Sequence, residues 1–179
     1  QDHYAAAFCS INFFKFHSDE SVSIRPVEET SKYTRQIFNS LETFYTNLNR
    51  DASKILSHQK KRDHVNVKNL LLLREQAENL YNQIYFKKIS VKKFGEILDE
   101  GWKIKKKLSK QVSNPMIDDI YFSAKKIGVY GGKLSGAGGG GFLSFAVKKE
   151  LKKKLVKTLT KKKIQHFPIK LESTGSLIL

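Results

Sequence analysis

The sequence predicts an α+β fold in which an antiparallel sheet is backed by helices. Two observations lead to this prediction. Residues 67–87 and 90–110 repeat apolar side chains at the three- and four-residue spacing of amphipathic helices. After residue 128 the pattern changes to strand, loop, strand, helix and strand. With 179 residues, of which 40% are hydrophobic, the chain is long enough to bury a core of its own.

The N-terminal part predicts a short helix followed by a β-hairpin. Residues 2–8 are rich in alanine and begin with Asp2, a residue type that suits the start of a helix. Residues 11–16 and 22–27 alternate partly between apolar and polar side chains and are separated by a polar turn, as in a hairpin. The next predicted elements are a helix over 30–39, a strand over 41–46 and a helix over 49–62.

Capping signals mark the later helices. Ser90 precedes the second amphipathic stretch, and Asn114-Pro115 predicts the start of a further helix that ends near Gly128. A strand over 142–147, a helix over 149–162 and strands over 164–171 and 176–179 complete the prediction.

Composition restricts the classes of function. The net charge of +16 favours binding to polyanions. However, the lysines are scattered along predicted helices, and only five arginines are present. We therefore interpret the lysines as a solvated surface rather than a nucleic-acid site. The single cysteine, Cys9, excludes an internal disulfide and fits a reducing cytoplasm. No run of eighteen apolar residues predicts a membrane span, and the five histidines show no metal-ligand spacing.

Residues 131–143 contain seven of the eleven glycines. Glycine at this density indicates positive φ angles or close approach to the main chain, and exposed amides in such a turn bind anions, most often phosphate. The pattern Gly136-x-Gly138-x-x-Gly141 matches a dinucleotide-binding turn, but residues 142–147 predict a strand where that turn requires a helix. A P-loop is excluded because no Gly-Lys-Ser/Thr closes the run. A flexible linker or a tight hairpin turn remains the alternative.

The segment Gln1-Asp2-His3-Tyr4-Ala5-Ala6-Ala7 resembles the Gln-Asp-Gln-Tyr-Ala-Ala segment of the GHMP kinases, in particular sugar kinases that act on D-glycero-D-manno-heptose phosphate. His3 stands where that segment has glutamine. Phe44-Tyr45-Thr46 with Arg50, Trp102-Lys103-Ile104-Lys105 with Leu108-Ser109, and the glycine run are similar to further segments of these kinases, in the same order.

This resemblance implies transfer of the γ-phosphoryl group of ATP to a sugar phosphate hydroxyl, the anomeric hydroxyl of D-glycero-D-manno-heptose 7-phosphate. It implies that Asp2 is the catalytic carboxylate and that Thr46 and Arg50 lie on the substrate side. It also implies a phosphate or nucleotide site at the glycine run, formed by Lys133, Ser135, Gly136, Ala137, Gly138, Gly139 and Gly140.

The resemblance further implies how the chain is organised. Residues 1–29 would end the N-terminal kinase domain, with the hairpin left from it, and residues 30–179 would form the ferredoxin-like C-terminal domain. The ATP-phosphate loop and the Mg²⁺ ligands would precede Gln1, so we expect no metal ligand in this chain and no activity from the chain alone. An apolar surface facing the other half would promote self-association. The alternative is a non-catalytic basic α+β module that binds RNA or another polyanion.

Overall fold

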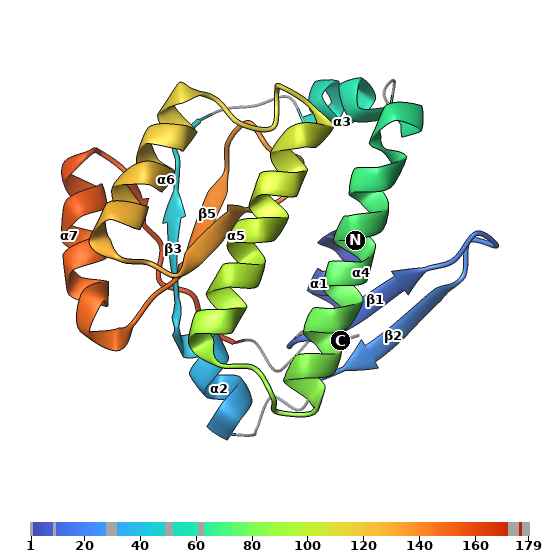
Figure 1. Cartoon of the computed structure of the whole chain (residues 1–179), viewed down its shortest axis with the longest axis horizontal. Coiled ribbons are helices and arrows are strands. Elements are labelled where there is room, and N and C mark those ends of the chain that lie inside the picture. The colour runs from blue at the N-terminus through green and yellow to red at the C-terminus, as the bar shows by residue number, and fades with distance from the viewer. Residues whose placement is uncertain are drawn as a thin grey trace.

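The computed structural model in Figure 1 describes residues 2–8, 10–27, 32–48, 52–60, 63–171 and 176. The N-terminal segment forms helix α1 (Asp2–Phe8) and a hairpin of strands β1 (Asn12–Phe16) and β2 (Val22–Pro26). The strands pair antiparallel, with Phe14 opposite Ile24. The ring of Tyr4 in α1 contacts the rings of Phe14 and Phe16, which joins the helix to the hairpin. The helix and hairpin predictions are confirmed.

A second sheet has four antiparallel strands in the order β4–β5–β3–β6. In chain order this places the first strand beside the third, with the second and fourth at the edges, as in the ferredoxin-like arrangement. The α+β prediction, with antiparallel strands and helices packed on them, is therefore confirmed. The strand bounds are β3 (Leu41–Tyr45), β4 (Gly131–Leu134), β5 (Phe142–Ala146) and β6 (Gln165–His166).

The last strand is much shorter than the predicted span of 164–171. The amide of Phe167 still donates a hydrogen bond to the carbonyl of Thr43, at 2.8 Å. Pro168 follows at once and has no N–H to continue the ladder, so strand pairing ends there. The predicted strand over 176–179 lies outside the described residues, apart from Ser176, which has no regular structure.

Helices account for most of the remaining chain, and the predicted caps form. The side chain of Ser90 accepts a hydrogen bond from the amide of Lys93, and that of Asn114 accepts one from the amide of Ile117. Gly128 closes its helix in the left-handed conformation, with φ of 104°. The helices are α2 (Lys32–Asn39), α3 (Ala52–Lys60), α4 (Asp63–Tyr85), α5 (Val91–Leu108), α6 (Pro115–Ile127) and α7 (Lys152–Lys161), which follows a 3₁₀ turn η1 (Lys149–Leu151).

The core has two parts. One lies between the sheet and helices α5, α6 and α7, where Phe44, Trp102 and Phe145 are fully buried. The other joins the end of the hairpin to α2, α4 and α5 through Val27, Ile37 and neighbouring side chains. None of the helices in the described part of the chain is long and apolar enough to cross a membrane.

Candidate functional site

The glycine run divides between a strand and a loop. Gly131 and Gly132 belong to β4, and residues 135–141 connect β4 to β5 at the upper end of the sheet in Figure 1. Four glycines of the loop have positive φ: 69° at Gly136, 112° at Gly138, 73° at Gly139 and 101° at Gly141. The expectation of positive φ is confirmed. The loop joins two paired antiparallel strands, with Leu134 opposite Leu143, so it closes a β-hairpin and is not a linker.

The second half of the loop is packed too closely for any side chain. A Cβ atom on Gly138 would lie 2.7 Å from the Cα of Val112, and one on Gly140 would lie 2.7 Å from the carbonyl oxygen of Leu48. Both distances are far below van der Waals contact and involve backbone atoms that cannot move aside. These glycines therefore fix the position of the loop against neighbouring segments.

Side chains from three helices or their caps hold the loop carbonyls. Lys105 of α5 donates to the carbonyl oxygens of Leu134 and Gly136. Gln59 of α3 donates to the carbonyl of Ala137 at 3.2 Å, and Asn114 donates to that of Gly139 at 3.2 Å. These hydrogen bonds stabilise the conformation of the loop.

Thr46 contacts the end of the loop. Its hydroxyl accepts a hydrogen bond from the amide of Gly141 at 2.9 Å and lies 2.9 Å from the carbonyl oxygen of the same residue. The amide of Thr46 also donates to that carbonyl at 2.9 Å. Thr46 is fully buried, so in this structure its side chain anchors the loop to the end of β3.

The first half of the loop borders a cavity of about 650 Å³. Gly136, Ala137, Lys105 and Lys133 line one side, and apolar residues of α4 and α5 line the other. Ser135, beside them, is exposed. Within the part of the chain that the structure describes, the amides of Gly136 and Ala137 donate no recorded hydrogen bond. Desolvation lowers the pKa of Lys133, although much of its side chain remains exposed.

This combination can bind an anion. The amides of Gly136 and Ala137 have no recorded partner among the described residues, and backbone amides of this kind can donate to an anion. Both residues line the cavity together with Lys105 and Lys133, whose ammonium groups add positive charge. A phosphate group fits this donor set because its oxygens accept several hydrogen bonds at once.

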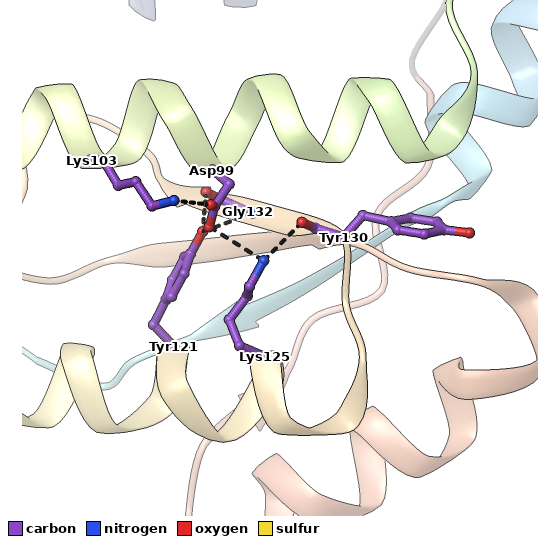
Figure 2. A network of polar contacts seen from close by, with 6 residues as sticks. All are labelled: Asp99, Lys103, Tyr121, Lys125, Tyr130 and Gly132. Atoms are coloured by element: carbon purple, nitrogen blue, oxygen red, sulfur yellow. Dashed lines mark hydrogen bonds and ion pairs between the residues drawn. The ribbon is translucent and has the colours of Figure 1, made fainter.

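A polar network around the buried carboxylate of Asp99 fixes the strand that leads into the loop (Figure 2). Tyr121 of α6 donates a hydrogen bond to Asp99 of α5 at 2.5 Å and accepts one from the amide of Gly132 in β4 at 3.2 Å. Lys103 lies 2.7 Å from the other carboxylate oxygen of Asp99. The ammonium nitrogen of Lys125 lies 3.6 Å from a carboxylate oxygen of Asp99. It also donates a hydrogen bond to the carbonyl of Tyr130, the residue before β4.

The electrostatics of this network favour an ionised Asp99. Burial raises the pKa of its carboxyl group, but the hydrogen bonds from Lys103 and Tyr121 outweigh that effect, so the net pKa is lowered. Burial, followed by the hydrogen bond to Asp99, raises the pKa of Tyr121 far above its ordinary value. The tyrosine therefore stays a neutral donor that links α5, α6 and β4.

The structure does not describe the side chains of two predicted site residues, Asp2 and Arg50. Asp2 is the first residue of α1, and the structure describes nothing of its side chain. The described contacts of α1 are with β1 and with Ser176, whose amide donates to the carbonyl of Ala7 at 3.2 Å. Arg50 lies outside the described residues. Among the residues that the structure does describe, no group of three His, Cys, Asp or Glu side chains is arranged to hold a metal ion.

Several residues that hold the loop or the strand before it have no sequence signal for that contact. Lys105 belongs to the Trp102–Lys105 segment of the resemblance, which was the one available signal for it. Gln59, Asn114 and Tyr121 lie on predicted helices, and nothing in their spacing indicates a contact with a loop that is distant in the sequence.

The chain has relatives among characterised kinases. It is 30% identical over 180 residues to D-glycero-alpha-D-manno-heptose 7-phosphate kinase from Campylobacter jejuni, a match that covers 98% of this chain and 52% of the relative. The chain thus spans about half the length of that relative. A second curated relative, mevalonate kinase from Methanocaldococcus jannaschii, is 36% identical over 74 residues, which is 41% of this chain and 23% of the relative.

The fold has a solved counterpart. The crystal structure of a D-glycero-D-manno-heptose 1-phosphate kinase from Bacteroides thetaiotaomicron superposes with a TM-score of 0.69 at 22% identity, covering 96% of this chain and 45% of that one. The family described as GHMP kinases C terminal matches residues 70–164, more than half of the sequence and the stretch that contains the glycine loop. The chain therefore belongs to the GHMP kinases and carries their C-terminal domain.

Proposed function

We propose that this chain supplies the C-terminal half of an ATP-dependent sugar kinase, which transfers the γ-phosphoryl group to the anomeric hydroxyl of D-glycero-D-manno-heptose 7-phosphate. The observation that carries the proposal is the glycine loop, where Gly136 and Ala137, whose amides have no recorded partner among the described residues, line a cavity with Lys105 and Lys133. The substrate is proposed from the 30% identity to the Campylobacter heptose 7-phosphate kinase.

The chemistry required of this half is electrostatic. Phosphoryl transfer depends on positioning and on stabilising charge on the phosphate oxygens, and pre-positioned N–H groups and ammonium groups supply that stabilisation. A loop that is held in one conformation needs no reorganisation when a phosphate arrives. Lys105 has a double role in the proposal, since it holds two loop carbonyls and adds charge at the cavity.

ATP would bring Mg²⁺, which neutralises charge on the phosphates. The described residues offer amides and ammonium groups but no cluster of carboxylates for the metal. We therefore propose that the metal ligands are supplied outside this chain, together with the rest of the nucleotide site. The chain by itself would bind phosphate weakly and transfer none.

Asp2 is proposed as the carboxylate that accepts the proton of the attacking hydroxyl. The sugar oxygen would form a bond to the γ-phosphorus as the bond to ADP breaks, and the proton would pass to Asp2. We further propose that residues 1–29 belong to the N-terminal kinase domain. The separate two-stranded sheet of β1 and β2 supports this division, because two strands alone are marginal and are normally part of a larger sheet.

The experiment measures phosphoryl transfer from γ-labelled ATP, with Mg²⁺, by the longest gene product that contains this chain. D-glycero-D-manno-heptose 7-phosphate and mevalonate serve as alternative acceptors, since both kinds of kinase are among the relatives. Transfer to the heptose phosphate is expected. Transfer only to mevalonate would reassign the substrate, and no transfer to any acceptor would favour the non-catalytic basic module.

The role of Asp2 is tested in the same assay. Asp2→Asn removes the proton acceptor and should lower kcat by about 10²-fold or more, with ATP binding nearly unchanged. His3→Gln is the matched control at the next position, because it introduces the residue of the resembling segment and should leave kcat close to wild type. If Asp2→Asn keeps full kcat, Asp2 has no catalytic role and serves the helix start only.

A further inference from the structure

A second and larger cavity lies at the opposite end of the sheet from the glycine loop. Its volume is about 810 Å³. It is bounded by α2, by the start of α5 and by the turn from β5 into η1. In Figure 1, α2 lies at the bottom of the molecule, whereas the loop between β4 and β5 lies at the top. Neither the sequence patterns nor the proposed kinase reaction assigns this cavity a role.

The lining is strongly basic. Lys32, Arg35, Lys148, Lys149 and Lys152 line the cavity with one acidic residue, Glu150. Lys152 is neutralised by Glu42, with 2.6 Å between its ammonium nitrogen and a carboxylate oxygen. The other four basic side chains form no recorded ion pair with any residue that the structure describes.

The cavity also has a fixed framework. The amide of Val147 donates to the carbonyl of Ser40 at 3.0 Å, which ties the end of α2 to the end of β5. The amide of Tyr130 donates to the carbonyl of Ala146 at 2.9 Å. Val91, Tyr130 and Val147 form an apolar floor between these segments. Positive charge is thus arranged around a concave surface rather than spread along a convex helix.

We propose that this cavity binds a small molecule with a polyphosphate group. Arg35 can form paired hydrogen bonds with one phosphate, and Lys148 and Lys149 can contact the next. A concave site of this size suits a small ligand. It disfavours a nucleic-acid strand, which is bound along an extended groove with stacking aromatic side chains. The proposal is independent of the kinase reaction, since it uses none of the residues of the glycine loop.

The test is isothermal titration of the 179-residue chain with sodium tripolyphosphate in 150 mM NaCl. The double variant Lys148→Gln with Lys149→Gln removes two cations from the cavity and should raise the dissociation constant about tenfold or more. The matched control is Lys153→Gln with Lys154→Gln, which removes the same charge from exposed positions in the first turn of α7, outside the cavity lining. It should change the constant by less than about twofold.

The binding site is located by amide resonances of the ¹⁵N-labelled chain. Tripolyphosphate should shift the amides of Asn39, Ser40, Val147 and Lys148, which belong to the cavity. All four substituted lysine side chains are exposed. Thermal melts of the two double variants check that both proteins remain folded. Equal weakening in the two double variants, shifts confined to residues 135–141, or an absence of binding by the wild-type chain would each overturn the proposal.

Discussion

The hydroxyl of Tyr121 lies 2.5 Å from a carboxylate oxygen of Asp99, and the two residues come from different helices. The amide of Gly132 donates to the same hydroxyl, so a single oxygen atom joins α6, α5 and β4 (Figure 2). Gly132 is three residues before the exposed start of the glycine loop at Ser135. The position of the loop therefore depends on helix packing on the face of the sheet.

Removing this hydroxyl should destabilise the protein. In Tyr121→Phe, Asp99 loses a donor and the amide of Gly132 loses its acceptor, and both groups stay largely buried. The free energy of unfolding should fall by about 1–3 kcal/mol, as for other unsatisfied buried groups. Urea unfolding measures it. Tyr45→Phe is the control, because its hydroxyl makes no recorded hydrogen bond within the described chain, and its effect should stay within about 0.5 kcal/mol.

The ionisation of Asp99 should appear in the pH dependence of stability. Its pKa in the folded protein is lower than in the unfolded chain, so the native state binds fewer protons in the acid range. The stability from Asp99 is therefore fully present above its unfolded pKa and is lost as pH falls through the folded value. Unfolding free energies of wild type and Asp99→Asn, measured between pH 7 and pH 2, should differ by a constant amount down to about pH 4 and converge as the pH falls further. A difference that stays constant over the whole range would show that the charge of Asp99 contributes nothing.

Much of the fold follows from local sequence signals. Ser90, Asn114-Pro115 and Gly128 mark helix ends through hydrogen bonds or backbone angles that involve only nearby residues, and the structure has helix ends at all three. The strand at Gly131 and Gly132 was harder to predict, because glycine has a low propensity for β-strands. The structure explains these glycines by close packing, since a Cβ on Gly131 would clash with the carbonyl oxygen of Gly95 in α5.

The candidate site was only partly predictable. The glycine run is local, so its positive φ angles could be inferred from composition alone. The donors that hold it are not local: Gln59 is 78 residues from Ala137, and Lys105 is 31 residues from Gly136. Such contacts depend on how α3 and α5 pack, and a single sequence carries no signal for that.

The two halves of the glycine loop should respond differently to substitution. Gly138→Ala places a Cβ 2.7 Å from the Cα of Val112 at a φ of 112°, so we expect a loss of about 2–4 kcal/mol of stability. Gly136 has a φ of 69°, which asparagine tolerates, and it borders the cavity. Gly136→Asn should cost less than about 1 kcal/mol but weaken phosphate binding by filling the anion site. Thermal melts and phosphate titrations separate the two effects; equal stability losses would contradict this division.

Substitution of Lys105 should raise the KM for ATP more than substitution of its neighbours on α5. Lys105→Met keeps the aliphatic stem but leaves the carbonyls of Leu134 and Gly136 without their ammonium donor, and it removes a charge from the cavity. In the intact kinase we expect the KM for ATP to rise about tenfold, the effect of losing one charge-assisted contact. Lys107→Met removes the same charge from an exposed position and should leave KM unchanged. Similar KM values for the two variants would place Lys105 outside the phosphate site.

The outer face of α4 should make the chain self-associate. Val65, Val67, Leu71 and Leu72 are 57%, 50%, 40% and 41% exposed on the first turns of the helix. Together with His64, Lys68 and Glu75 they line a hollow of about 480 Å³. Apolar side chains gathered at an exposed hollow favour association, because contact with another surface removes them from water. We expect the 179-residue chain to form dimers or larger species whose proportion grows with concentration.

Sedimentation velocity over a range of protein concentrations measures this association. The double variant Leu71→Gln with Leu72→Gln should shift the population toward monomer, because it introduces polar groups that the apolar contact would have to desolvate. Phe122→Gln on α6 is the control, since that ring is 58% exposed but lies outside the α4 surface. If the control reduces association as strongly as the double variant, the association does not depend on the α4 face. A wild-type chain that remains monomeric at every concentration would contradict the prediction itself.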